Sequence, residues 1–184
     1  DLAPLSQMTQ LGYLEVSNNQ IADLTPLETM TGIYGLDCSG NRVQDLTPLT
    51  AMHSLKNLTI SNNQIANLDA LAGLTQIETL DLSNNPIGNV MPLMGSSTLR
   101  KLSLAQNPNI HLGDIYELHR SLPNCEFLSQ EFTDQIPTSP NAIEWEIRRR
   151  IQKPAGPLMQ ADLAAVKVLD LSHRQLVDLT PLAG

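Results

Sequence analysis

The stretch Leu55–Leu74, with the sequence LKNLTISNNQIANLDALAGL, determines the fold because its pattern recurs along most of the chain. Apolar residues occupy Leu-x-x-Leu-x-Ile, an asparagine follows, and Ile-x-x-Leu-x-x-Leu-x-x-Leu completes the unit. The corresponding asparagines are spaced 22 residues apart: Asn19, Asn41, Asn63, Asn85 and Asn107. A fixed period in this range predicts a solenoid, in which each coil buries its apolar side chains against the next coil.

Each unit begins with a segment that predicts a short strand. In Leu-x-x-Leu-x-Leu, alternate side chains point inward, so stacked copies should form a parallel sheet with strands about 4.8 Å apart. The asparagine follows where the chain turns back inside the solenoid. Its amide offers donors and an acceptor, so we expect the five asparagines to form a structural ladder that bonds otherwise unpaired backbone groups.

The second half of each unit, as in Ile21–Leu27, has apolar residues at spacings of three. This spacing favours short 3-10 turns over a long helix. A proline recurs at one phase of the lattice, in Pro4, Pro26, Pro48, Pro92 and Pro181. We expect this proline at the first position of each turn, where its missing N–H costs nothing.

The fifth unit departs from the pattern after Asn107. Asp114 is predicted to cap a true helix. One face of that helix would hold Ile115, Leu118 and Leu122. The segment Cys125–Leu128 is then predicted to form a final partial strand.

Composition limits the classes of function. The chain has 184 residues and a formal net charge of −8, which argues against nucleic acid as a partner. No run of 18 apolar residues occurs, so we expect no membrane insertion. Asp1–Gln7 has no signal-peptide pattern and matches the second half of a coil. We therefore expect a mature product or an excised fragment. Cys38 and Cys125 should lie about four coils, or roughly 19 Å, apart, too far for a disulfide.

The lattice divides the chain into three predicted parts. Residues 1–133 form the array, of about five coils plus partial ends. Residues 134–165 form a helical cap that opens a second array, with a helix starting at Ser139-Pro140. Residues 166–184 form the first, truncated repeat of that array.

The two ends of the sequence stop at the same phase of a coil. Asp178–Leu182 matches Asp1–Leu5, so the chain is either two trimmed tandem arrays or a permuted one. We expect head-to-tail or swapped self-association through these cut repeat ends. In such an assembly, the strand at 167–171 of one molecule would stack beside the strand at 13–16 of another.

The coil Leu55–Leu74 closely resembles the 22-residue class of leucine-rich repeats in the internalin family of bacterial surface proteins. The segment Ser139–Leu182 resembles the helical cap and first repeat of bacterial members. The resemblance implies an α/β, right-handed leucine-rich-repeat solenoid, or horseshoe. Its parallel sheet would form the concave face, with short 3-10 turns on the convex side and a helical cap segment. It also implies that the concave sheet binds a protein partner.

Strand positions that alternate with the buried ones should point outward on this concave face. If a ligand binds there, we predict that it contacts Tyr13, Glu15, Asp37, Asn57, Thr59, Asp81 and Lys101. The alternative is a merely solvated sheet face. The predicted face is polar and mildly acidic and offers one tyrosine, whereas interface hot spots favour Trp, Tyr and Arg.

No catalytic constellation is visible in the sequence. The histidines are scattered without the spacing of metal ligands, and no glycine-rich phosphate loop occurs. We therefore expect no enzyme activity, no metal and no cofactor. The predicted function is a non-catalytic protein-binding module, extracellular or at the surface of a bacterial cell. The alternatives are a cytoplasmic regulatory or scaffold subunit that binds an enzyme, and the docking part of a larger enzyme.

Overall fold

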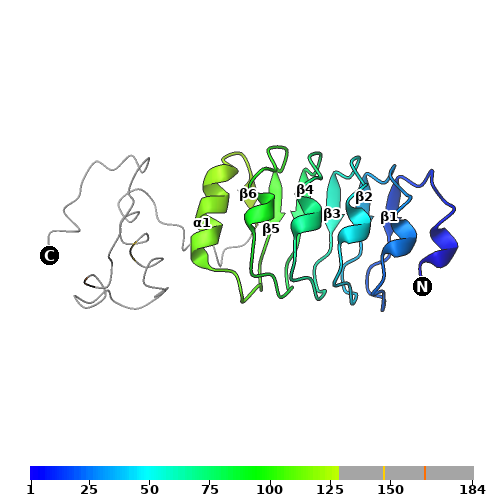
Figure 1. Ribbon diagram of the computed structural model, residues 1–184, viewed down its shortest axis with the longest axis horizontal. Helices are drawn as coiled ribbons and strands as arrows, with labels where there is room; N and C mark the ends of the chain where they lie inside the picture. Colours follow the sequence, from blue (N-terminus) through cyan, green and yellow to red (C-terminus); the bar gives the residue numbers. More distant parts are fainter. Residues whose placement is uncertain (129–146, 148–163, 165–184) are drawn as a thin grey trace. The chain divides into compact units, whose positions relative to one another are not determined.

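A computed structural model describes residues 1–128 of the chain, together with Ile147 and Ala164, which are both helical. The chain divides into two units, Asp1–Thr133 and Asp134–Gly184. The first unit contains the strands and turns of the solenoid (Figure 1). The predicted helical cap of 134–165 and the predicted repeat of 166–184 lie outside the described residues, apart from Ile147 and Ala164.

Six short parallel strands form one sheet in sequence order. They are β1 (Tyr13–Glu15), β2 (Gly35–Asp37), β3 (Asn57–Thr59), β4 (Thr79–Asp81), β5 (Lys101–Ser103) and β6 (Glu126–Phe127). From β1 to β5 each residue pairs with the residue 22 positions later, as Leu36 does with Leu58. The solenoid predicted from the period is therefore confirmed, with its strands on one side and its turns on the other (Figure 1).

The predicted apolar lattice forms the core. The central leucine of each strand from β1 to β5 is buried: Leu14, Leu36, Leu58, Leu80 and Leu102. The apolar residue two positions after the asparagine is buried as well, in Ile21, Val43, Ile65 and Ile87. Because each coil presents the same side chains at the same height, every coil covers the apolar face of its neighbour.

Short 3-10 turns run opposite the sheet, as predicted. They are η1 (Ala3–Leu5), η2 (Thr25–Leu27), η3 (Thr47–Leu49), η4 (Asp69–Leu71) and η5 (Met91–Leu93). The predicted position of the proline is wrong by one residue, since Pro26 is the second residue of η2. The first residue needs its N–H, because the N–H of Thr25 donates to Asp23 Oδ1 over 2.8 Å. Proline therefore suits the next position, which has no intrahelical acceptor.

The α-helix α1 (Leu112–Ser121) follows the fifth strand in place of a sixth 3-10 turn. The predicted cap is wrong: His111 is the N-cap residue, and Asp114 lies within the first turn. A carboxylate in the first turn still faces the positive end of the helix dipole. Ile115 and Leu118 are buried as predicted. The predicted last strand is confirmed by β6, which pairs with β5.

Candidate functional site

Asparagine side chains fix the height of each strand relative to the next. Asn41, Asn63, Asn85 and Asn107 are buried. Each Oδ1 accepts a backbone N–H from the preceding coil, and the four donors are Ile21, Val43, Ile65 and Ile87, at 2.9, 2.9, 3.0 and 3.3 Å respectively. Each Nδ2 also donates to a carbonyl of the preceding coil, as Asn63 does to Cys38 over 3.0 Å. The amides therefore bond each coil to the coil before it.

Asn19 differs from the other four asparagines. Its side chain is exposed, and within residues 1–128 its Nδ2 donates to two carbonyls of its own coil, those of Val16 and Ser17. Within residues 1–128, the amide bonds between coils are therefore made by Asn41, Asn63, Asn85 and Asn107.

The residue before each asparagine has a left-handed backbone, a feature that the sequence analysis missed. Positive φ values near 55° recur at Asn18, Asn62, Asn84 and Gln106, and Gly40 has a φ of 66°. Asparagine and glycine adopt this conformation more readily than other residues. The recurrence of Asn or Gly at this one phase was a visible signal for the sharp turn at the strand end.

The structure places the seven predicted contact residues in two rows across the sheet. The first strand positions form the row Tyr13, Gly35, Asn57, Thr79 and Lys101. The third strand positions form the row Glu15, Asp37, Thr59, Asp81 and Ser103. We call these two rows the sheet face. Its charged side chains are Glu15 on β1, Asp37 on β2, Asp81 on β4 and Lys101 on β5, so the acidic pair on adjacent strands lies at the β1–β2 end.

The side chains of the sheet face differ in exposure. Tyr13, Glu15, Asn57 and Lys101 are exposed, whereas Asp37, Thr59 and Asp81 are half-buried. Both aspartates have a local role. Asp37 Oδ1 accepts the backbone N–H of Ser39 over 2.8 Å and its hydroxyl over 2.7 Å. Asp81 Oδ1 accepts the same two groups of Ser83. These bonds hold the carboxylates at the end of the strand.

Two tyrosines lie on adjacent coils and pack over glycines of each other's coil. A Cβ atom built on Gly35 would lie 2.5 Å from Cδ2 of Tyr13, and one built on Gly12 would lie 2.6 Å from Cε1 of Tyr34. Both side chains remain 51% exposed. Tyr34 was not among the predicted contact residues, because it precedes β2 and does not belong to the outward strand positions. Gly12 and Gly35, at slots that hold large side chains in other coils, were the available signal.

The residue before each strand forms a row beside the sheet face: Gly12, Tyr34, Lys56, Glu78 and Arg100. Lys56 Nζ lies 3.2 Å from Glu78 Oε1, and both side chains are about half exposed. An exposed pair of this kind adds little stability. The Glu78 carboxylate does, however, pair with the charge of Lys56, and it lies on the coil that is farther from Tyr34.

Both cysteines are free thiols. Cys38 is buried in the core, as its lattice slot predicts. Burial, and next the charge of Asp37, raise the pKa of the Cys38 thiol to about 12. Burial is also the main cause that raises the pKa of Cys125 to about 11. Both are therefore protonated at neutral pH and poor nucleophiles.

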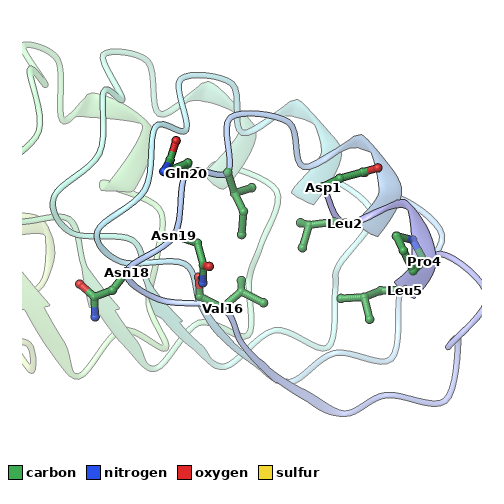
Figure 2. A pocket seen from close by; sticks show the side chains of 9 residues that line it. Asp1, Leu2, Pro4, Leu5, Val16, Asn18, Asn19 and Gln20 are labelled. Carbon is green, nitrogen blue, oxygen red and sulfur yellow. The ribbon is translucent and has the colours of Figure 1, made fainter.

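A hollow of about 790 Å³ lies beside the first coil (Figure 2). Its lining residues are Asp1, Leu2, Pro4, Leu5, Val16, Asn18, Asn19, Gln20 and Ile21. Four of the lining residues, Leu2, Leu5, Val16 and Ile21, belong to the same lattice as the core. The strand that we predict to stack against β1 of a second molecule lies outside the described residues, so that self-association stays a prediction.

Within residues 1–128, no group of three or more His, Cys, Asp and Glu side chains could hold a metal ion. No helix in the described part of the chain has the length and apolar character needed to cross a bilayer.

Comparison with known proteins agrees with this geometry. The model of the family "Leucine Rich repeats (2 copies)" matches residues 35–73 and 53–93. No curated protein sequence matches the chain.

Among solved structures, the chain is similar to an internalin from Listeria monocytogenes, with 32% identity and a TM-score of 0.62 over 71% of this chain and 38% of that one. It is similar to internalin C2 of the same species, with 32% identity and a TM-score of 0.62 over 69% of this chain and 54% of that one. A leucine-rich-repeat protein of Leptospira interrogans is 26% identical, with a TM-score of 0.62 over 67% of this chain and 32% of that one.

The chain thus spans between about a third and about half of the length of these structures. These three structures come from bacteria, and two are internalins and one a leucine-rich-repeat protein. The chain is therefore a leucine-rich-repeat protein of the bacterial, internalin-like type.

Proposed function

We propose that this protein-interaction module binds its protein ligand on the sheet face, without catalysis, and that it acts at the surface of a bacterial cell or after secretion. The observation that supports the binding face is the regular placement of its polar side chains. Tyr13, Glu15 and Asn57 project from strands whose spacing is fixed by backbone pairing and by the asparagine amides. Such a face is organised before the ligand arrives, which lowers the entropic cost of binding.

The location is proposed from the similarity to internalins. A cytoplasmic regulatory or scaffold subunit is the alternative, and a docking segment of a larger enzyme is another. Fractionation of cells that produce the native protein separates these cases. Recovery from the medium or from the intact cell surface supports the proposal, and recovery only from the cytoplasm contradicts it.

The binding face can be tested by site-specific photo-crosslinking within a single coil. A photoreactive amino acid replaces Asn57 on β3 in one variant and Ala72, which follows η4 on the opposite side, in the matched control. Both positions are exposed. We expect a discrete crosslinked protein from the first variant, competed by excess unmodified chain, and none from the second. Equal crosslinking of both variants, or none at the first position, would refute the proposal.

Self-association is a second proposal, supported by the hollow beside β1 and by Asn19. The Oδ1 of Asn19 accepts no hydrogen bond from residues 1–128, and the lining of the hollow is partly apolar. Both features match what a further coil of the same lattice would contact. Light scattering over a concentration series tests the proposal. A molar mass that rises with concentration supports it, and a constant monomer mass contradicts it.

A further inference from the structure

We propose that the β1–β2 end of the sheet face, together with the adjoining Tyr34, recognises a basic protein segment, with a Lys or Arg side chain lying against Tyr13 and Tyr34 and facing the carboxylates of Glu15 and Asp37. We call these four residues the aromatic–acidic patch. The proposal rests on the proposed function, because it names the chemistry of a ligand for the same face.

The first argument is the arrangement of the rings. Tyr13 packs over Gly35 and Tyr34 packs over Gly12, so each ring is supported by the backbone of the adjacent coil. A side chain larger than hydrogen at either glycine would displace the ring. Both tyrosines are nevertheless 51% exposed. Supported rings lose little conformational freedom when a ligand binds, and an exposed aromatic face attracts a cation within about 6 Å.

The second argument is the charge beside the rings. Glu15 and Asp37 are partners in the β1–β2 register, so they lie one strand spacing, about 4.8 Å, apart. Like charges at directly opposed positions destabilise a sheet. Within residues 1–128 the ion pairs are Lys56–Glu78 and Arg120–Glu117, and neither includes the two carboxylates of the patch. A cation from a partner would relieve this repulsion.

The third argument concerns the cations of the chain itself. The basic residue next along the row from Tyr34 is Lys56, and its Nζ is engaged by Glu78 one coil farther from the patch. Lys101 lies three strands away from β2. The whole chain carries 19 acidic and 11 basic residues, so its field attracts a basic partner. Charge complementarity therefore selects a basic segment over an acidic or neutral one.

Fluorescence anisotropy with a labelled peptide of alternating Arg and Ser tests the patch. A peptide of alternating Glu and Ser is the charge-reversed probe. We expect the Arg peptide to bind and the Glu peptide not to bind. At about 1 M salt, where the Debye length is about 3 Å, binding of the Arg peptide should weaken strongly.

The variants separate the patch from the general negative charge of the chain. Glu15→Gln and Glu28→Gln each remove one exposed carboxylate, so they leave the same net charge, but Glu28 follows η2 on the opposite side. We expect Glu15→Gln, Asp37→Asn and Tyr13→Ala each to weaken binding about two- to fivefold, and Glu28→Gln to leave it unchanged. Tyr13→Phe keeps the ring and should bind like the parent chain. The Asn in Asp37→Asn keeps the acceptor for Ser39, so the strand end is preserved.

Two results would overturn the inference. One is equal affinity for the Glu15→Gln and Glu28→Gln chains, which would reduce the binding to net charge. The other is equal affinity for the two peptides. The crosslinking at Asn57 distinguishes the two proposals. If the partner is still captured by a chain with Glu15→Gln, Asp37→Asn and Tyr13→Ala together, the patch is wrong and the sheet face stands; if Asn57 captures nothing, the proposed function fails.

Discussion

Replacing Asn63 by alanine removes one complete step of the amide ladder from the middle of the array. The side chain is 9% exposed. Its Oδ1 accepts the N–H of Val43 over 2.9 Å, and its Nδ2 donates to the carbonyls of Cys38, Ile60 and Ser61 over 3.0, 3.1 and 3.1 Å. Asn63→Ala therefore affects four backbone groups in two coils.

The three carbonyls each keep another donor. The carbonyl of Cys38 keeps Asn41, that of Ile60 keeps Asn85, and that of Ser61 keeps the N–H of Gly40. Within residues 1–128, Asn63 Oδ1 is the acceptor of the Val43 N–H, so this N–H becomes an unpaired donor within the core. One buried unpaired group costs about 1–3 kcal/mol, and we expect Asn63→Ala to lower the free energy of unfolding by this amount. For a chain of this size that corresponds to a midpoint about 2–12 °C lower.

Hydrogen exchange of single amides gives the sharper measurement. We expect the N–H of Val43 to lose far more protection than the N–H of Ile65, which remains bonded to Asn85 Oδ1. Asn19→Ala is the matched control, because no N–H of the described residues donates to its Oδ1, and it should cost less than Asn63→Ala. Equal loss of protection at Val43 and Ile65, or equal destabilisation by the two substitutions, would refute the reasoning.

Three further predictions concern the turns and the core. Hydrogen bonds from the hydroxyl and then the backbone N–H of Thr25 lower the pKa of Asp23 below 3.8, and Thr47 does the same for Asp45. Their stabilisation is present above pH 3.8 and is lost as pH falls through the lowered pKa, so Asp23→Asn with Asp45→Asn should flatten the fall of the melting temperature below about pH 4. Cys38, with a pKa of about 12, should react with a thiol reagent no faster than the core opens, measured by labelling at increasing urea. Gly40→Ala should cost about 1–2 kcal/mol in urea unfolding because its φ is 66°, and Gly40→Asn should cost less.

The coils, the sheet and the core could be predicted from the sequence because the same apolar and asparagine positions recur in every unit. A buried Leu58 alone is ambiguous, but Leu58 at the same phase as Leu36 and Leu80 leaves one consistent stacking. Register follows from the period, since a shift by one residue would bring the apolar side chains out of the core. The predicted start of α1 was wrong because this helix follows Asn107, where the repeat pattern is lost. Its cap had to be inferred from Asp114 alone.

The details of the surface could not be predicted in the same way, because the lattice repeats only what every coil needs. The patch depends on Tyr34, which occupies a slot that holds Lys56 and Glu78 in the next two coils. The Tyr34 ring is exposed and packs over Gly12 of the preceding coil. The sequence of one repeat unit does not reveal this contact, because it involves two coils. Some residues also have two roles. Asp37 belongs to the sheet face, and its carboxylate also accepts hydrogen bonds from the N–H and the hydroxyl of Ser39.

The residues that set the fold and the residues that can contact a ligand are largely different. The asparagines and leucines that set the strand spacing are buried, whereas Glu15 and Asn57 are exposed and their side chains accept no backbone N–H within residues 1–128. A substitution at these exposed positions changes the chemistry of the sheet face without creating an unpaired buried group, so it should cost little stability. The two glycines of the patch behave differently. A side chain at Gly12 or Gly35 would displace a tyrosine ring and leave the ladder intact. Substitutions at the β1–β2 end can therefore abolish binding while the fold is kept. For that reason, peptide affinity and the free energy of unfolding of these variants can be measured separately.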